Sequence, residues 1–86
     1  MKKVWKVLVI DDEPPARRTI IRMMEEYGGQ LQLIGEADSG IEAIEKINTV
    51  KPELLFLDIQ LQDMDGFEIL KKTDHKPLVI FTTAYD

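Results

Sequence analysis

The chain has 86 residues, which favours one small domain, and its hydrophobic content of 44% is typical of a folded protein rather than a disordered one. It has no cysteine and a single histidine, which argues against disulfides, zinc-thiolate sites, thiol catalysis and the usual transition-metal sites. The formal net charge of -5, with scattered basic residues, argues against direct binding of nucleic acid.

The first expected element is a strand over residues 7–10, where four apolar residues follow one another. A continuous apolar run is typical of a parallel strand that is covered on both faces, so we expect a central strand. A helix should follow, because apolar residues recur at helical spacing between a pair of prolines and a pair of glycines. The prolines are Pro14 and Pro15, the glycines are Gly28 and Gly29, and the apolar face is Ala16, Ile20, Met23, Met24 and Tyr27. We interpret both methionines as core residues.

Residues 30–37 are predicted to form an edge strand, because polar and apolar residues alternate at the start of this segment. A second helix is expected next, since Ser39 and Glu42 form a capping-box pattern ahead of three isoleucines at helical spacing. Pro52 ends that segment before the following strand. This part of the chain therefore repeats the order of strand and helix.

Residues 54–57 and 78–81 are further continuous apolar runs, and we expect both to be central strands. Between them, Asp65 is predicted to cap a short helix that carries Phe67 and Leu70 on its buried side. Strict alternation of strands and helices predicts right-handed crossovers. The expected fold class is α/β, with a doubly wound parallel sheet between two layers of helices.

Each expected central strand ends in polar side chains, namely Asp11 and Asp12, then Asp58, then Thr82 and Thr83. In a parallel sheet these ends share one edge, where open α/β sheets bind ligands. Carboxylates at such short distances raise one another's pKa values unless a cation binds between them. A site made only of oxygen ligands suits Mg²⁺. We therefore expect a magnesium site in which Asp58 is a nucleophile able to form an aspartyl-phosphate and Thr83 bonds a phosphoryl oxygen. Taken alone, Asp11, Asp12 and Glu13 would rather indicate a solvated turn between a strand and a helix, and Thr82 an ordinary strand residue.

At these residues the sequence resembles the receiver domain of bacterial two-component response regulators, most of all those attached to LytTR-type output domains. The segments that carry the resemblance are VLVIDDEP, LLFLDIQLQDMDGFEIL and VIFTTAYD. The resemblance implies a flavodoxin-like (CheY-like) fold and phosphorylation at Asp58. It also implies that Asp11, Asp12, Asp58 and the backbone carbonyl of Gln60 bind Mg²⁺, and that Thr83 is the switch hydroxyl.

The resemblance further implies a regulatory phosphoacceptor rather than an enzyme, with a sensor histidine kinase as phosphoryl donor and an output controlled by a conformational switch. DNA binding would belong to a LytTR-type output domain of the parent protein and not to this chain. Receiver domains continue through a fourth helix, a fifth strand with an essential lysine and a fifth helix, whereas no lysine follows Lys76 here. We therefore expect residues 1–86 to be an incomplete receiver domain, truncated after the fourth strand. Gln62 stands where the family usually has proline.

Two other functions remain open from the sequence. The first is an interaction module that has the receiver fold but is not phosphorylated. The second is a Mg²⁺-dependent phosphatase with an aspartate nucleophile, which would need a second acid where Gln60 stands.

Two expectations concern assembly and location. The apolar run near the end of the chain, as an open sheet edge, predicts a homodimer or a domain-swapped form. No apolar run approaches the roughly 20 residues of a membrane span, and the first residues lack a signal peptide's cleavage region. We therefore expect a cytoplasmic protein without a membrane partner.

Overall fold

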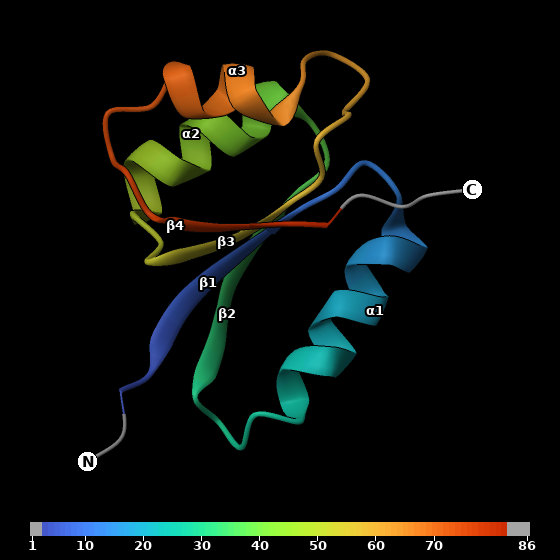
Figure 1. Ribbon diagram of the computed structural model, residues 1–86, viewed down its shortest axis with the longest axis vertical. Coiled ribbons are helices and arrows are strands. Elements are labelled where there is room, and N and C mark those ends of the chain that lie inside the picture. The colour runs from blue at the N-terminus through green and yellow to red at the C-terminus, as the bar shows by residue number, and fades with distance from the viewer. Residues whose placement is uncertain (1–2, 83–86) are drawn as a thin grey trace.

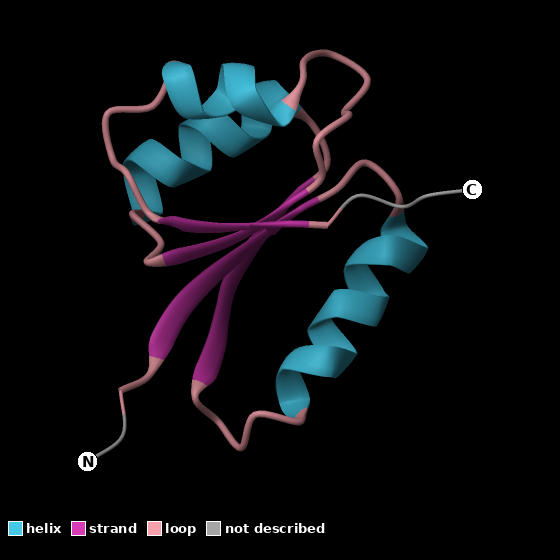
Figure 2. Cartoon of the chain, in the orientation of Figure 1, coloured by secondary structure: helices cyan, strands magenta, loops and turns pink. Residues whose placement is uncertain are grey.

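The computed structural model describes residues 3–82, which form a four-stranded sheet with helices on both faces (Figures 1 and 2). In chain order the elements are β1 (Trp5–Ile10), α1 (Pro14–Glu25), β2 (Leu31–Ala37), α2 (Gly40–Val50), β3 (Leu54–Leu57), α3 (Gly66–Lys71) and β4 (Leu78–Phe81). The strand order is β2-β1-β3-β4, and every pair of neighbours is parallel. This confirms the predicted doubly wound α/β fold. Within residues 3–82, no helix combines the length and the apolar character that crossing a membrane would require.

The two helices on the same face of the sheet, α2 and α3, begin at the capping residues predicted from the sequence. The hydroxyl of Ser39 accepts a hydrogen bond of 3.1 Å from the backbone N–H of Glu42. At the start of α3, a carboxylate oxygen of Asp65 accepts a bond of 2.8 Å from the N–H of Glu68. The carboxylate of Glu42 accepts from the N–H of Asp38, so the return bond of the capping box reaches one residue further back than the usual pattern.

The sheet separates two hydrophobic clusters, because successive side chains of a strand point to opposite faces. One cluster packs against α2 and α3 and includes Leu8, Ile10, Leu55 and Leu57, and the other packs against α1 and includes Val7, Val9, Leu54 and Phe56. The four residues of β3 and the last four of β1 are all buried. These two strands are therefore central, as predicted, and they fix the positions of the loops that follow them.

Three predictions about burial were wrong. β4 is not a central strand: within residues 3–82 it pairs only with β3 and forms the open sheet edge that the prediction about assembly assumed, where Leu78 is 59% exposed. Met23 and Phe67, expected in the core, are 38% and 52% exposed. The reason for Met23 is that α1 packs mainly against β1 and β2 and leaves the β4 side of its face open. Phe67 instead packs against Phe81 near the edge, with ring centroids 5.2 Å apart.

Candidate metal centre

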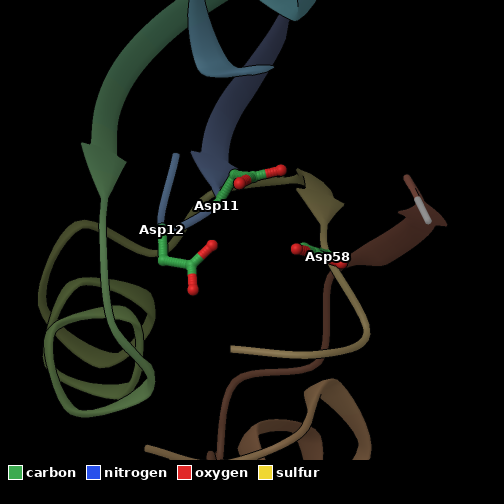
Figure 3. A group of neighbouring side chains, drawn as sticks. All are labelled: Asp11, Asp12 and Asp58. Carbon is green, nitrogen blue, oxygen red and sulfur yellow. The ribbon is translucent and has the colours of Figure 1, made fainter. Parts of the chain in front are cut away.

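Three carboxylates meet at the carboxyl edge of the sheet (Figure 3). Asp11 and Asp12 follow β1, and Asp58 follows β3. The two strands are parallel neighbours in which Ile10 pairs with Leu57, so the residues after them emerge side by side. One carboxylate oxygen from each of the three aspartates lies within 4.8 Å of the others. The structure thus brings together the three acids that the sequence placed at one edge.

Backbone hydrogen bonds orient the two loops that carry these acids. The N–H of Asp58 donates to the carbonyl of Ile10 at 3.0 Å, which continues the pairing of β3 with β1 up to the site. The carboxylate of Asp11 accepts from the N–H of Glu13 at 2.9 Å. The carboxylate of Asp58 accepts from the N–H of Gln60 at 3.3 Å. The carboxylates of Asp11 and Asp58 are therefore each held by an amide two residues further on, in an Asx-turn arrangement.

The acids of this site concentrate negative charge. Asp11 is only 5% exposed, whereas Asp12 and Asp58 are half-buried. Burial raises the pKa of Asp11, and the charges of Asp58, Asp12 and Glu13 raise it further, against the hydrogen bond from the N–H of Glu13, which lowers it. None of the ion pairs among residues 3–82 includes any of the three aspartates. An all-oxygen donor set with uncompensated charge is what a hard divalent cation such as Mg²⁺ requires.

Arg17 is a neighbouring cation that the sequence analysis missed. Its guanidinium donates to the backbone carbonyl of Asp11 at 2.6 Å and to the carboxylate of Glu36 at 3.0 Å, and its side chain is 16% exposed. Arg17 thus connects α1 to the end of β1 and to β2. Because it binds the backbone carbonyl of Asp11 and not the carboxylate, it does not neutralise that acid directly. The local sequence carries no signal for this role, because Glu36 lies 19 residues away along the chain.

Two further site residues were predicted, Gln60 in the loop after β3 and Thr83 after β4. Gln60 is exposed in the loop after β3, and it forms an isolated antiparallel bridge with Asp65. Thr83 lies outside the described residues. The preceding Thr82 follows β4, and its N–H donates to the carbonyl of Leu57 at 2.9 Å. The pairing of β4 with β3 therefore continues to the residue before Thr83, at the same edge as the acids.

Comparison with known families assigns residues 7–86 to the response regulator receiver domain. The sensory transduction protein LytT of Bacillus anthracis is 46% identical over 84 residues, which cover 94% of this chain and 34% of LytT. The transcriptional regulatory protein BtsR of Salmonella typhi is 39% identical over 83 residues, again 94% of this chain and 34% of the relative. The chain therefore spans about a third of the length of the curated relatives it matches.

Solved structures agree with this assignment. The signal receiver domain of the response regulator NarL from Mycobacterium tuberculosis superposes with a TM-score of 0.84 at 29% identity, over 98% of this chain and 69% of that one. The response regulator domain of CheB from Thermotoga maritima gives a TM-score of 0.79 at 30% identity, over 94% of this chain and 61% of that one. Both are receiver domains, and both share the arrangement of strands and helices described above.

Proposed function

The chain belongs to the response regulator receiver domain family, and on that premise we propose that Asp58 accepts a phosphoryl group in a Mg²⁺-dependent reaction. The observation that carries the proposal is the position of Asp58 at the end of a buried central strand, with its carboxylate within 4.8 Å of those of Asp11 and Asp12. Phosphorylation adds a charge of about -1.5 to -2 at neutral pH, which is enough to bias a domain between two conformations. The role is regulatory, and the only reaction assigned to the chain is its own phosphorylation and dephosphorylation.

The residues that would hold the metal are Asp11, Asp12 and Asp58, with the backbone carbonyl of Gln60 as a further ligand. The support for Mg²⁺ is the all-oxygen donor set, together with the raised pKa of Asp11, which follows from its burial and, in smaller part, from the charges of Asp58, Asp12 and Glu13. When bound, the cation neutralises the charge of the carboxylates and of the phosphoryl oxygens, so that one anion is able to attack another.

In the transfer step, a carboxylate oxygen of Asp58 attacks the phosphorus atom of the donor. A new O–P bond forms as the bond from phosphorus to the leaving group breaks, and the leaving group departs with the electron pair. The donor we propose is the phosphohistidine of a sensor histidine kinase, whose imidazole nitrogen is the leaving group, or a small acyl phosphate. The hydroxyl of Thr83 is proposed to donate to a phosphoryl oxygen and to sense its presence.

The proposal extends to the parent protein. We propose an output domain of the LytTR type, which would bind DNA, in a protein that works in the cytoplasm. The similarity to a sensory transduction protein and to a transcriptional regulatory protein supports a regulatory output. The apolar edge strand β4, with Leu78 59% exposed and Ile80 47% exposed, supports self-association as a homodimer or a domain-swapped form. Light scattering over a range of concentrations tests this last point, and a monomer at the highest concentration would refute it.

The decisive experiment is the intact mass of the chain after incubation with Mg²⁺ and acetyl phosphate. We expect one phosphoryl adduct on the parent chain and none on Asp58→Asn. Asp74→Asn is the matched control, because it removes an exposed carboxylate from the loop before β4, away from the acidic site, and it should gain the adduct. An adduct on Asp58→Asn would refute the assignment of the acceptor. A chain that binds Mg²⁺ yet gains no adduct would instead be a binding module with a receiver fold.

A further inference from the structure

A single carboxylate ties the loop between β3 and α3 to the start of α2. One oxygen of Asp63 accepts a hydrogen bond of 2.7 Å from the N–H of Gly40, and the other accepts one of 3.0 Å from the N–H of Ile41. These are the first two amides of α2, and amides at a helix start have no carbonyl partner within the helix. The two bonds lower the pKa of Asp63, as expected for a carboxylate at the positive end of a helix.

The loop and the helix also pack closely. A Cβ atom added to Gly40 would lie 2.2 Å from Cγ and 2.7 Å from Sδ of Met64, so any larger residue there would force the Met64 side chain to move. The same Cβ would lie 3.1 Å from the Asp63 oxygen that binds Gly40. Met64 in turn packs against the hydrophobic cluster that α2 and α3 cover. The contact between loop and helix is therefore made both by hydrogen bonds and by packing.

The loop that Asp63 anchors is the one that carries the acceptor. It begins directly after Asp58 and is closed by two backbone hydrogen bonds, from Leu61 N–H to the carbonyl of Met64 at 3.2 Å and from Gly66 N–H to the carbonyl of Ile59 at 2.6 Å. The side chain of Leu61 is 9% exposed and belongs to the same hydrophobic cluster. The loop is thus a compact unit, and a group that fixes its tip also fixes its beginning.

Helix capping alone does not account for Asp63. The N-cap residue of α2 is Ser39, whose hydroxyl already accepts from the N–H of Glu42. Asp63 binds the two preceding amides from a loop that lies 22 and 23 residues away along the chain. What it adds beyond capping is a connection between α2 and the loop of the acceptor.

We propose that Asp63 is a positioning residue for phosphoryl transfer. By joining the loop to α2, it holds the Asp58 carboxylate and the Gln60 carbonyl in place relative to Asp11 and Asp12. Without these two hydrogen bonds the loop keeps its internal bonds and the packing of Leu61 and Met64, but the four groups are aligned less of the time, which weakens metal binding. This inference rests on the proposed function, because the aligned groups are the proposed ligands of Mg²⁺.

The test compares Asp63→Ala with Ser39→Ala in the full chain. Both variants remove hydrogen bonds from the start of α2, but only the first one disconnects the loop, so Ser39→Ala controls for damage to the helix. Amide hydrogen exchange of Leu61 and Gly66, measured by NMR without metal, reports on the loop. Calorimetric titration with Mg²⁺ reports on the alignment of the ligands. Asp63→Asn keeps one good acceptor oxygen and serves as a milder variant should Asp63→Ala unfold.

In Asp63→Ala we expect exchange at both amides to rise about tenfold and the Kd for Mg²⁺ to rise about tenfold, as for other residues that support metal ligands. Asp63→Asn should lie between this variant and the parent, and Ser39→Ala should match the parent in both measurements. Equal effects of Asp63→Ala and Ser39→Ala would overturn the proposal. So would faster exchange with unchanged Mg²⁺ affinity, because the connection would then be structural only. A parent chain that binds no Mg²⁺ would refute the proposed function and this role with it, while the exchange data would still show whether Asp63 ties the loop.

Discussion

A cluster of three aspartates and a single fourth aspartate lie beyond the carboxyl ends of the strands, and their surroundings carry opposite charge. In the acidic site, Asp11, Asp12 and Asp58 face one another, and burial together with the neighbouring charges raises the pKa of Asp11. At the start of α2, Asp63 faces two backbone N–H groups, and its pKa is lowered. The difference teaches that the groups across from an aspartate decide its role. Carboxylates that face one another suit a cation, whereas a carboxylate that faces backbone amides accepts hydrogen bonds from them.

The largest expected difference between the acidic site and Asp63 is in how much Mg²⁺ raises the free energy of unfolding. At a concentration 100 times its Kd, Mg²⁺ should raise the free energy of unfolding by about 2.7 kcal/mol, because it binds the folded chain. Asp12→Asn should lose most of this gain, since it removes one proposed ligand, while Asp63→Ala should keep a part of it. Urea unfolding with and without Mg²⁺ measures the difference, and an equal gain in Asp12→Asn and the parent would contradict the assignment of the site.

The next largest effect is that of removing the Asp63 carboxylate on the free energy of unfolding. Asp63→Ala should lower the free energy of unfolding without metal, because it leaves two amides of α2 without their acceptors. The loss should exceed that of Ser39→Ala, which removes the acceptor of one amide only. Urea unfolding of both variants without Mg²⁺ decides the order. A smaller loss in Asp63→Ala would mean that water replaces Asp63 at little cost.

Removing a charge from the acidic site should raise the free energy of unfolding without metal, whereas removing Asp63 lowers it. Without metal, Asp58→Asn should stabilise the fold by roughly 0.5 kcal/mol, because it relieves repulsion among carboxylates that partly face solvent. With saturating Mg²⁺ the same variant should be less stable than the parent. Thermal unfolding in the two conditions shows whether the sign changes, and destabilisation of equal size in both would argue against repulsion in the metal-free site.

The smallest effect is on the dependence of stability on pH, and its sign differs between the regions. The pKa of Asp63 is lower in the folded chain than in the unfolded chain. Its carboxylate therefore stabilises the fold above the ordinary pKa of about 3.9, and this stabilisation is lost as the pH falls through the pKa of the folded chain. The pKa of Asp11 is higher in the folded chain, so stability is lost as the pH rises from about 3.9 through the folded value.

Urea unfolding between pH 3 and 7 separates these contributions. Relative to the parent, Asp63→Ala should show a weaker loss of stability on the acidic side, below about pH 4, because the lowered group is gone. Asp11→Asn should remove a loss that the parent shows above about pH 4, without Mg²⁺. Identical pH profiles for both variants would mean that the two carboxylates do not differ in the way their surroundings indicate.

Local sequence patterns sufficed for most of the fold. Apolar runs placed β1, β3 and β4 along the chain, alternation identified β2 as an edge strand, and capping residues located the starts of α2 and α3. These features could be predicted because they depend on neighbours within a few residues. Proximity of Asp11, Asp12 and Asp58 also followed from the sequence, since parallel strands align their carboxyl ends at one edge.

By itself, the sequence determined the alternation of strands and helices, the family and the three acids that meet at one edge of the sheet. Only the tertiary structure decided that Met23 and Phe67 are exposed, that Arg17 binds the end of β1 and that Asp63 binds the start of α2. An apolar run records that a segment avoids water, but not which of its faces another element covers. Likewise, a charged side chain takes its role from groups that the fold brings from distant parts of the chain, and no local pattern encodes that partner.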